Sequence, residues 1–331
     1  MSRAGLNRKT GLATLTLVLA SETPDLDIVT LFGGSVSYLQ HHRGITHSLL
    51  GAPFVAAGTL AIVYAIYRLL LARGRKPKIA PNWRLLYFYA LFASLVHIFL
   101  DFTNSYGVRP FAPFNRSWYS WDIAFVVDPV ILVILVLALA IPGLLGLISE
   151  EIGARKAPRG RPAAIVALVC FAALLYFRDF EHRRAVNLLQ SVTYGGEDPL
   201  RVSAYATALN PFVWNGVVET RDFFELTVVD PRAGQIGSDE TPVRRPKPEE
   251  NRETLAAKQS WLGRVYLDWA QYPVVEAQRL PDEEGYRVQF IDLRFERTFA
   301  QGQPPPLSGH VILDPQLRVV DEYVGAPRPG R

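Results

Sequence analysis

The chain has 331 residues, a length that corresponds to about two domains. Apolar residues make up 49% and charged residues 20%, so the composition excludes a disordered or fibrous protein. The net charge is only +4, which predicts no nucleic-acid partner. The one cysteine, Cys170, excludes an intrachain disulfide and a zinc site built from several cysteines.

Long apolar stretches fill the first half of the chain. A helix that crosses a bilayer needs about 20 mostly apolar residues. Thr10–Ser21 is shorter and spans only if its helix starts near Gly5. A buried core helix is the alternative for any single stretch, but several close together favour a membrane domain. We expect an α-helical integral membrane domain with about five transmembrane helices in residues 1–178. Four further stretches contain no Asp, Glu, Lys or Arg: Leu49–Tyr67, Leu85–Leu100, Pro129–Ser149 and Ala163–Phe177.

Residues 179–331 have a different pattern, in which short runs alternate between apolar and polar residues. Such alternation is typical of half-buried strands. Residues 231–256 are polar and rich in turn formers, which predicts a long loop. We expect a soluble α+β domain with a mainly antiparallel sheet. The predicted strands are Phe223–Val229, Tyr286–Phe295, Val311–Leu313 and Leu317–Val320.

Basic residues predict the orientation in the membrane, because short loops rich in Lys and Arg stay in the cytoplasm. The three basic segments alternate with the segments 22–47 and 101–127. We therefore expect these two segments, and the soluble domain, on the extracytoplasmic face. The basic residues are Arg3, Arg8 and Lys9, then Arg73, Arg75, Lys76, Lys78 and Arg84, then Arg155, Lys156, Arg159 and Arg161.

Histidines and aspartates gather at the predicted outer ends of the helices. Asp25 and Asp27 follow the first apolar stretch, and His97 and Asp101 are four residues apart, so the latter two share one helix face. Imidazole combined with carboxylate suits zinc, manganese or iron. For Asp25 and Asp27 the alternative is a helix cap and turn. Three converging segments nevertheless predict a divalent-metal site. The middle segment, HHRGITHS, contains His41, His42 and His47.

The motifs PDLD, HHRGITHSLLG, HIFLDFTNSYGVRPFAPF and DIAFVVDP resemble those of the YdjM-like family of LexA-regulated, inner-membrane metal-dependent hydrolases. The resemblance covers roughly residues 1–150. It implies a multi-pass protein of the bacterial inner membrane with a helical fold related to zinc-dependent phospholipase C and single-strand nucleases. Those relatives use clustered His and Asp to hold zinc ions and cut phosphoesters. The metal ligands that the resemblance implies are Asp25, Asp27, His42, His47, His97 and Asp101.

The start of the chain departs from the family pattern. Family members usually begin with a helix that carries a Thr-His-x-x-x-Gly motif, whose His is a further ligand candidate. Here the opening MSRAGLNRKTGLA resembles the segment after that helix, and no His precedes His41. We expect translation to begin upstream and to add this helix. The alternative is a genuinely short protein with a degenerate site.

Two further residues are catalytic candidates. Arg43 is suited to bind a substrate phosphate, because its planar guanidinium can donate two parallel hydrogen bonds to one oxyanion. An ion pair with Asp25 or Asp27 suits it equally well. Asp128 and Asp122 lie near the predicted site by topology. Asp128 precedes Pro129, so a helix N-cap is the alternative role for it.

The other polar and aromatic residues have simpler interpretations. His41 is expected to neighbour the site without binding metal, and Cys170 to be inert within a helix. The residues expected in an interfacial aromatic belt are Trp118, Tyr119 and Trp121, and the histidines expected to lie in the soluble domain without acidic partners are His182 and His310.

Two functions of different class follow. The first is a membrane-bound hydrolase that uses zinc, with manganese as the alternative, on phosphoester or lipid-type substrates at the extracytoplasmic face. The second is a non-catalytic membrane protein in which a metal clamps the helices and the soluble domain binds a partner. An open coordination position favours the first, and a closed site favours the second.

Overall fold

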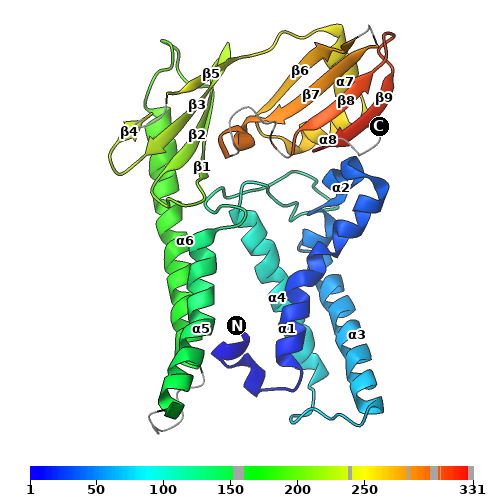
Figure 1. Cartoon of the computed structure of the whole chain (residues 1–331), viewed down its shortest axis with the longest axis vertical. Helices are drawn as coiled ribbons and strands as arrows, with labels where there is room; N and C mark the ends of the chain where they lie inside the picture. The colour runs from blue at the N-terminus through cyan, green and yellow to red at the C-terminus, as the bar shows by residue number, and fades with distance from the viewer. Residues whose placement is uncertain (152–159, 238–240, 282–283, 299–304, 306, 327–331) are drawn as a thin grey trace. The chain divides into compact units, whose positions relative to one another are not determined.

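The computed structural model describes the chain except residues 152–159, 238–240, 282–283, 299–304, 306 and 327–331, and describes residues 145–151 by their backbone alone. The described residues form two compact units (Figure 1). The first unit contains Met1–Leu26 and Arg43–Asp179, and the second contains Asp27–His42 and Phe180–Arg331.

The first unit is helical. Among the described residues, three of its helices are long and apolar enough to cross a membrane, and the described apolar part of a fourth, Pro129–Leu144, is shorter. The three are α3, α4 and α6, and the fourth is α5. Helix α1 has 10 residues, a rise of about 15 Å against a bilayer core of about 30 Å. The expectation of membrane helices is confirmed for three elements, whereas the count of five is not reached. The helices are α1 (Ala13–Glu22), α3 (Gly51–Ala72), α4 (Trp83–Thr103), α5 (Pro129–Glu151) and α6 (Arg161–Gln190), the last of which continues into the second unit.

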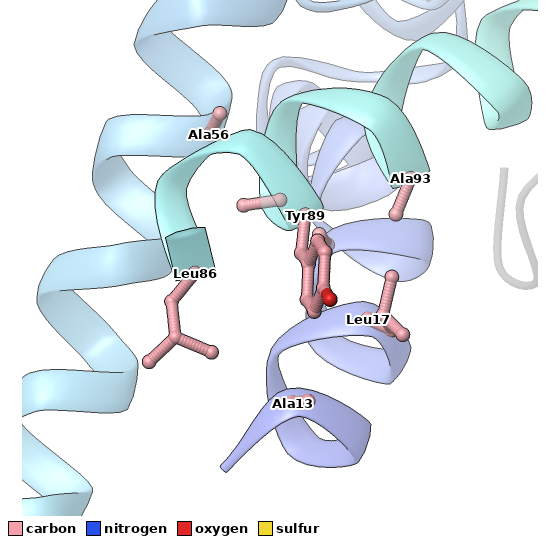
Figure 2. Close-up of a cluster of buried hydrophobic side chains, with 8 residues drawn as sticks. Ala13, Leu17, Ala56, Leu86, Tyr89 and Ala93 are labelled. Carbon is pink, nitrogen blue, oxygen red and sulfur yellow. The ribbon is translucent and has the colours of Figure 1, made fainter. Parts of the chain in front are cut away.

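Helix α4 packs against α1 and α3 through small side chains (Figure 2). Ala56, Ala90 and Ala93 are fully buried at these contacts, and Leu86 and Tyr89 fill the space between the helices. Small residues let helix backbones approach closely, which is how helices pack in lipid, where burying apolar surface gains little. This packing fixes the positions of the helix ends that carry the polar residues.

Hydrogen bonds show which helix ends lie together in the first unit. Ile123 N and Ala124 N both donate to Thr103 O, 3.0 Å away, so the start of α5 lies beside the end of α4. At the opposite end, Gly11 N donates to Ala80 O, and Arg161 Nε donates to Ala4 O. The segment before α1, the α3–α4 connection and the start of α6 therefore share one end of the unit. The other end holds the polar segments 22–26 and 101–128.

The second unit contains two antiparallel sheets. In the first, the order is β1-β2-β3-β4, with β5 also pairing with β3, and in the second it is β6-β7-β8-β9. The expectation of an antiparallel C-terminal domain is confirmed, but as two sheets where one was predicted. The strands are β1 (Arg201–Ala206), β2 (Trp214–Glu219), β3 (Phe223–Asp230), β4 (Gln235–Ile236), β5 (Val243–Pro246), β6 (Pro273–Arg279), β7 (Tyr286–Asp292), β8 (Gly309–Leu313) and β9 (Val319–Val324).

Among the described residues of this unit, three short helices accompany the sheets besides the end of α6. Helix α2 (Ser35–His41) packs against α8 (Trp261–Trp269) and β9, and Ser35 Oγ accepts a hydrogen bond from Val324 N at 2.8 Å. Helix α7 (Arg252–Lys258) begins inside the predicted loop 231–256, which also contains β4 and β5. The loop prediction is therefore wrong in these parts. Asn251 and Thr254 form a reciprocal capping box, which starts a helix in a sequence that is polar throughout.

Candidate metal centre

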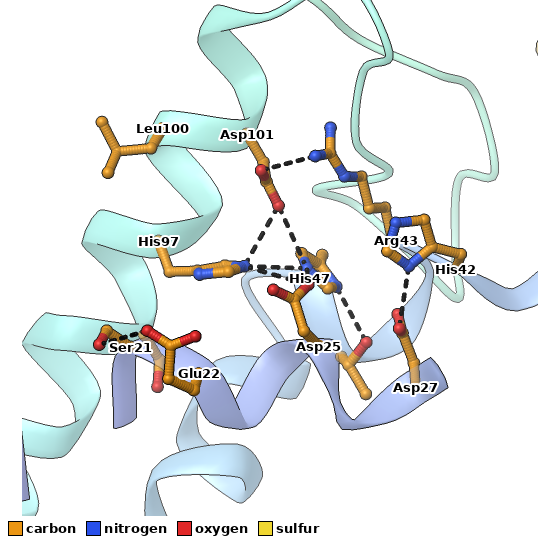
Figure 3. Close-up of polar contacts among 12 residues, drawn as sticks. Ser21, Glu22, Asp25, Asp27, His42, Arg43, His47, His97, Leu100 and Asp101 are labelled. Atoms are coloured by element: carbon orange, nitrogen blue, oxygen red, sulfur yellow. Dashed lines mark hydrogen bonds and ion pairs between the residues drawn. The ribbon is translucent and has the colours of Figure 1, made fainter. Parts of the chain in front are cut away.

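Four of the predicted ligands meet at one end of the first unit (Figure 3). Asp25 lies three residues after the end of α1, and His47 ends a short 3₁₀ turn just before α3. His97 and Asp101 are on successive turns near the end of α4. Three helix ends therefore bring two imidazoles and two carboxylates to one point.

The donor atoms of these four residues are close to evenly spaced. His47 Nε2 lies 3.2 Å from Asp25 Oδ1, 3.2 Å from His97 Nε2 and 3.2 Å from Asp101 Oδ2. His97 Nε2 lies 3.2 Å from Asp101 Oδ2 and 3.5 Å from Asp25 Oδ1. Zinc bound by four tetrahedral ligands at about 2.0–2.1 Å would hold neighbouring ligand atoms about 3.3 Å apart. Five of the six distances in the cluster have this length, so the residues fit a tetrahedral metal ion.

Local contacts orient the His47 ring. His47 is fully buried, and its Nδ1 lies 3.0 Å from Thr46 Oγ1. When Nδ1 carries the proton and donates it to this hydroxyl, the lone pair is on Nε2, which faces the other three donors. The turn is held against α3 by Ser48, whose Oγ donates to Ile45 O and accepts from Gly51 N, each at 2.8 Å. Gly51 is required here, because a Cβ would lie 1.7 Å from Ile45 O.

The cluster is open on the side of Asp25. The Asp25 side chain is 49% exposed, whereas those of His97 and Asp101 are 15% and 14% exposed. Partial burial by itself raises the pKa of the Asp25 carboxyl, but hydrogen bonds from His47 and His97 outweigh it and hold the pKa well below its ordinary value. Asp25 is therefore a carboxylate at neutral pH, with one face toward solvent.

Arg43 lies beside the cluster and is held on several sides. Its Nη2 forms an ion pair with Asp101 Oδ1 at 2.8 Å, and its Nη1 donates to Asn104 Oδ1 at 3.0 Å. Its guanidinium carbon lies 4.8 Å from the centre of the Tyr106 ring. The backbone of Arg43 has a φ of 54°, a left-handed conformation that is uncommon outside glycine. The predicted pairing of Arg43 with a carboxylate occurs with Asp101, where Asp25 or Asp27 was expected.

The segment that follows α4 supports Arg43, a role that the sequence did not reveal. Asn104 Oδ1 also accepts from Tyr106 N at 2.9 Å, and Arg109 N donates to Arg43 O at 3.2 Å. The Trp118 ring packs against Tyr106 and lies under the Arg109 guanidinium at 4.2 Å. The half-buried Trp118 thus belongs to a stack of rings and guanidinium groups, and its place in an interfacial belt stays a prediction.

The remaining two predicted ligands form a pair in the second unit. His42 Nδ1 lies 2.9 Å from Asp27 Oδ1, and both side chains are largely buried. The His42 ring stacks on Tyr38 with ring centres 4.6 Å apart. His41 is exposed, and its Nδ1 lies 2.8 Å from Ser37 O one turn earlier in α2. Of the HHR segment, His42 therefore meets a carboxylate and His41 does not.

Asp128 adopts the capping role that the sequence left as an alternative. Its carboxylate accepts from Val130 N at 3.0 Å and Ile131 N at 3.1 Å, in the first turn of α5. It also forms an ion pair with Arg178, whose side chain is 1% exposed. Asp122 has a left-handed backbone with a φ of 61°. The Asp128–Arg178 ion pair joins the start of α5 to α6 within the first unit.

Other singled-out residues serve the surrounding structure. Trp121 Nε1 donates to Asp179 at 2.8 Å, and Tyr119 pairs its backbone with Val108. His182 packs near Trp214 with ring centres 5.3 Å apart. His310 stacks on Tyr323, and burial and the nearby Arg287 lower its pKa. Cys170 is an exposed free thiol.

Comparison with known proteins agrees with the resemblance of the motifs. The chain is 30% identical over 127 residues to the protein described as "Uncharacterized protein YfhP" of Bacillus subtilis (strain 168). This match covers 38% of the chain and 36% of that relative, so the chain aligns with about a third of its length. No solved structure matches the chain. The model of the family described as "YdjM inner membrane protein" matches residues 2–185, more than half of the chain, and the chain therefore belongs to the YdjM inner membrane protein family.

Proposed function

We propose that the protein is a membrane-bound, metal-dependent hydrolase that acts on phosphoester or lipid-type substrates at the extracytoplasmic face. The observation that carries this proposal is the set of four donor atoms from Asp25, His47, His97 and Asp101, spaced for one divalent ion and open at Asp25. Zinc fits the nitrogen and oxygen donors and the spacing, and manganese is the alternative. Such an ion, when bound, supplies Lewis-acid polarisation of a phosphoryl or acyl oxygen. Asp27 and His42 remain ligand candidates from the sequence.

Arg43 supplies the complementary charge in this proposal. Its guanidinium is already desolvated and fixed by Asp101, Asn104 and Tyr106, so little side-chain entropy is lost when it meets a substrate oxyanion. A fixed positive group beside the metal ligands favours the negative charge that develops on a phosphoryl or acyl oxygen. Asp128 stays a catalytic candidate from the sequence, and its capping bonds give it a positioning role at the start of α5.

The proposed sidedness rests on charge. The end of the first unit opposite the cluster contains Arg3, Arg8 and Lys9 before α1, and Arg73, Arg75, Lys76 and Lys78 after α3, with no acidic residue in either segment. Loops of this kind stay in the cytoplasm. We propose five crossings, by α1 together with its preceding turns and by α3, α4, α5 and α6, in the bacterial inner membrane. The cluster and the second unit are then extracytoplasmic.

The alternative function is a metal clamp without catalysis, with the second unit binding a partner. One observation favours it: four protein ligands at tetrahedral spacing complete the coordination of zinc, as in structural sites. The exposure of Asp25 favours the catalytic proposal, because a half-exposed carboxylate can yield its position to substrate or water.

Hydrolysis by the full chain distinguishes the two functions. The chain is reconstituted with zinc in phosphatidylethanolamine and phosphatidylglycerol vesicles, and the release of headgroup phosphate, fatty acid and a soluble aryl phosphate product is measured. We expect release that falls to background in His97→Ala and is kept in His41→Ala. If the zinc-loaded chain releases none of these products while His97→Ala loses the metal and unfolds more readily, the clamp is the correct function.

A further inference from the structure

Apolar side chains crowd the surface next to the metal centre. Six of them, which we call the rim patch, are exposed although they are large and apolar. Phe114 is 88% exposed and Phe54 is 72% exposed. Monomeric soluble proteins rarely expose contiguous apolar patches of more than a few hundred Å². The rim patch consists of Ile45, Leu49, Leu50, Phe54, Phe111 and Phe114.

Hydrogen bonds place the segments that carry the rim patch side by side. Leu49 N donates to Pro110 O at 2.9 Å, which places the start of α3 beside the segment that contains Phe111. Asn115 N donates to Phe111 O at 3.1 Å, so Phe111 and Phe114 are on one tight turn. Ile45 lies beside the start of α3, because Ser48 Oγ donates to Ile45 O and accepts from Gly51 N. Phe54 follows Leu50 by one helical turn.

The apolar surface continues along a candidate membrane helix. Phe54 belongs to α3, one of the helices that can cross a membrane, and Ile62 and Leu69 carry its exposed apolar surface onward. Segment 110–114 contains no charged residue, whereas Asn115, Arg116 and Ser117, which follow it, are polar and exposed. An apolar turn bordered by polar residues is the arrangement expected where a protein surface enters the acyl region from the headgroup layer.

We propose that the rim patch inserts into the bilayer, with Phe111 and Phe114 among the acyl chains and Arg116 at the headgroups. Ile45 lies two residues from both Arg43 and His47, so this anchor fixes the metal centre at the depth of the headgroups. Insertion of the rim patch does not depend on whether the centre hydrolyses a substrate. Insertion would confine any ligand of the centre to molecules that reach it from the membrane surface.

Spin-label accessibility tests this inference on the full chain. A nitroxide is attached to Phe114→Cys in a Cys170→Ser background, because Cys170 is exposed and would also react. The chain is reconstituted in vesicles of phosphatidylethanolamine and phosphatidylglycerol, and relaxation by oxygen is compared with relaxation by a water-soluble nickel chelate. Ile62→Cys, on α3, is the matched position in lipid. Leu209→Cys, an apolar residue that is 81% exposed in the second unit, is the matched position in water.

We expect the label at Phe114 to behave like that at Ile62, with a several-fold higher ratio of oxygen to nickel relaxation than at Leu209. A label at Phe111→Cys, on the same turn as Phe114 and 48% exposed, should give the same result and covers the case in which the first variant is not recovered. A ratio equal to that at Leu209 would overturn the inference. So would shielding from both reagents, or spin–spin broadening, because these would identify a protein partner or a second copy on the patch.

Discussion

The Nε2 atoms of His47 and His97 face each other at 3.2 Å, although the two residues are 50 positions apart in the chain. Two imidazole nitrogens at this distance need a proton or a cation between them, because their lone pairs repel. Asp25 and Asp101 each place a carboxylate oxygen against the same pair of nitrogens. The arrangement therefore favours a positive ion at the centre, and the ends of three helices fix the four side chains around that point.

Replacement of Arg43 separates metal binding from substrate binding. Arg43→Lys keeps a positive charge near Asp101 but loses the planar fork that also reaches Asn104. We expect metal content close to that of the parent chain and a turnover lowered by about 10-fold or more, the loss of roughly one charge-assisted hydrogen bond. Metal analysis and vesicle hydrolysis measure the two effects. Loss of metal in Arg43→Lys would instead assign Arg43 to holding Asp101.

The buried Asp128–Arg178 pair should stabilise the fold because each charged side chain neutralises the other. Asp128→Asn keeps a side chain able to cap α5 but leaves the buried Arg178 without its counter-charge. We expect a loss of about 3–5 kcal/mol in the free energy of unfolding. Asp128→Asn combined with Arg178→Met should recover part of this loss. Denaturation of the parent chain, the two single variants and the double variant in detergent measures the coupling. Equal losses in the single and double variants would contradict the assignment, and a loss of hydrolysis in a well-folded double variant would support a catalytic role for Asp128.

His310 should make the second unit less stable in mild acid. Burial and the charge of Arg287 lower its pKa in the folded chain below the value of about 6.5 of an exposed histidine. The unfolded chain then binds the proton more readily, so the stabilisation is complete above about pH 6.5 and is lost as the pH falls through the lower, folded pKa. His310→Leu should flatten this dependence in unfolding experiments, and His41→Leu, at an exposed histidine, should not. An unchanged slope in His310→Leu would exclude this cause.

The proposed orientation predicts which cysteines an impermeant reagent reaches in intact cells. In a Cys170→Ser background, Leu209→Cys in the second unit should react with a membrane-impermeant maleimide from outside. Lys76→Cys, in the basic connection after α3, should react only after the cells are opened. The reverse pattern would place the metal centre at the cytoplasmic face.

The residues of the candidate metal centre could be located from the sequence because few polar residues interrupt the apolar stretches. Because His97 and Asp101 are four residues apart, their side chains lie on the same face of one helix. The ends of neighbouring helices lie together at one side of a bundle, which brings the other candidates close. The partner of Arg43 could not be predicted, because it depends on the left-handed backbone at Arg43 and on how segment 104–119 folds back over it. Neither feature has a local sequence signal, and charge alone left Asp25, Asp27 and a substrate as equal partners.

The fold could be predicted from the sequence only in part. Charge-free stretches predicted α3, α4 and α6, since composition alone shows that they are apolar. Strand alternation located β3, β7 and β8. Strands β1, β2 and β6 were missed because buried and exposed residues do not alternate along them. Two sheets could not be told from one, because the sequence does not show where pairing stops. The limits of α1 were also open, because its apolar run is close to half the length of a span.

The metal content of the purified full chain tests the central claim most directly. Zinc and manganese are measured by mass spectrometry in the parent chain, in His47→Ala with His97→Ala, and in His41→Ala. The His41 side chain is exposed, and its Nδ1 lies 2.8 Å from Ser37 O one turn earlier in α2. We predict about one ion per chain in the parent and in His41→Ala, and none above background in the double variant. An equal metal content in all three chains, or none in the parent after loading with zinc, would contradict the assignment of Asp25, His47, His97 and Asp101 as a metal centre.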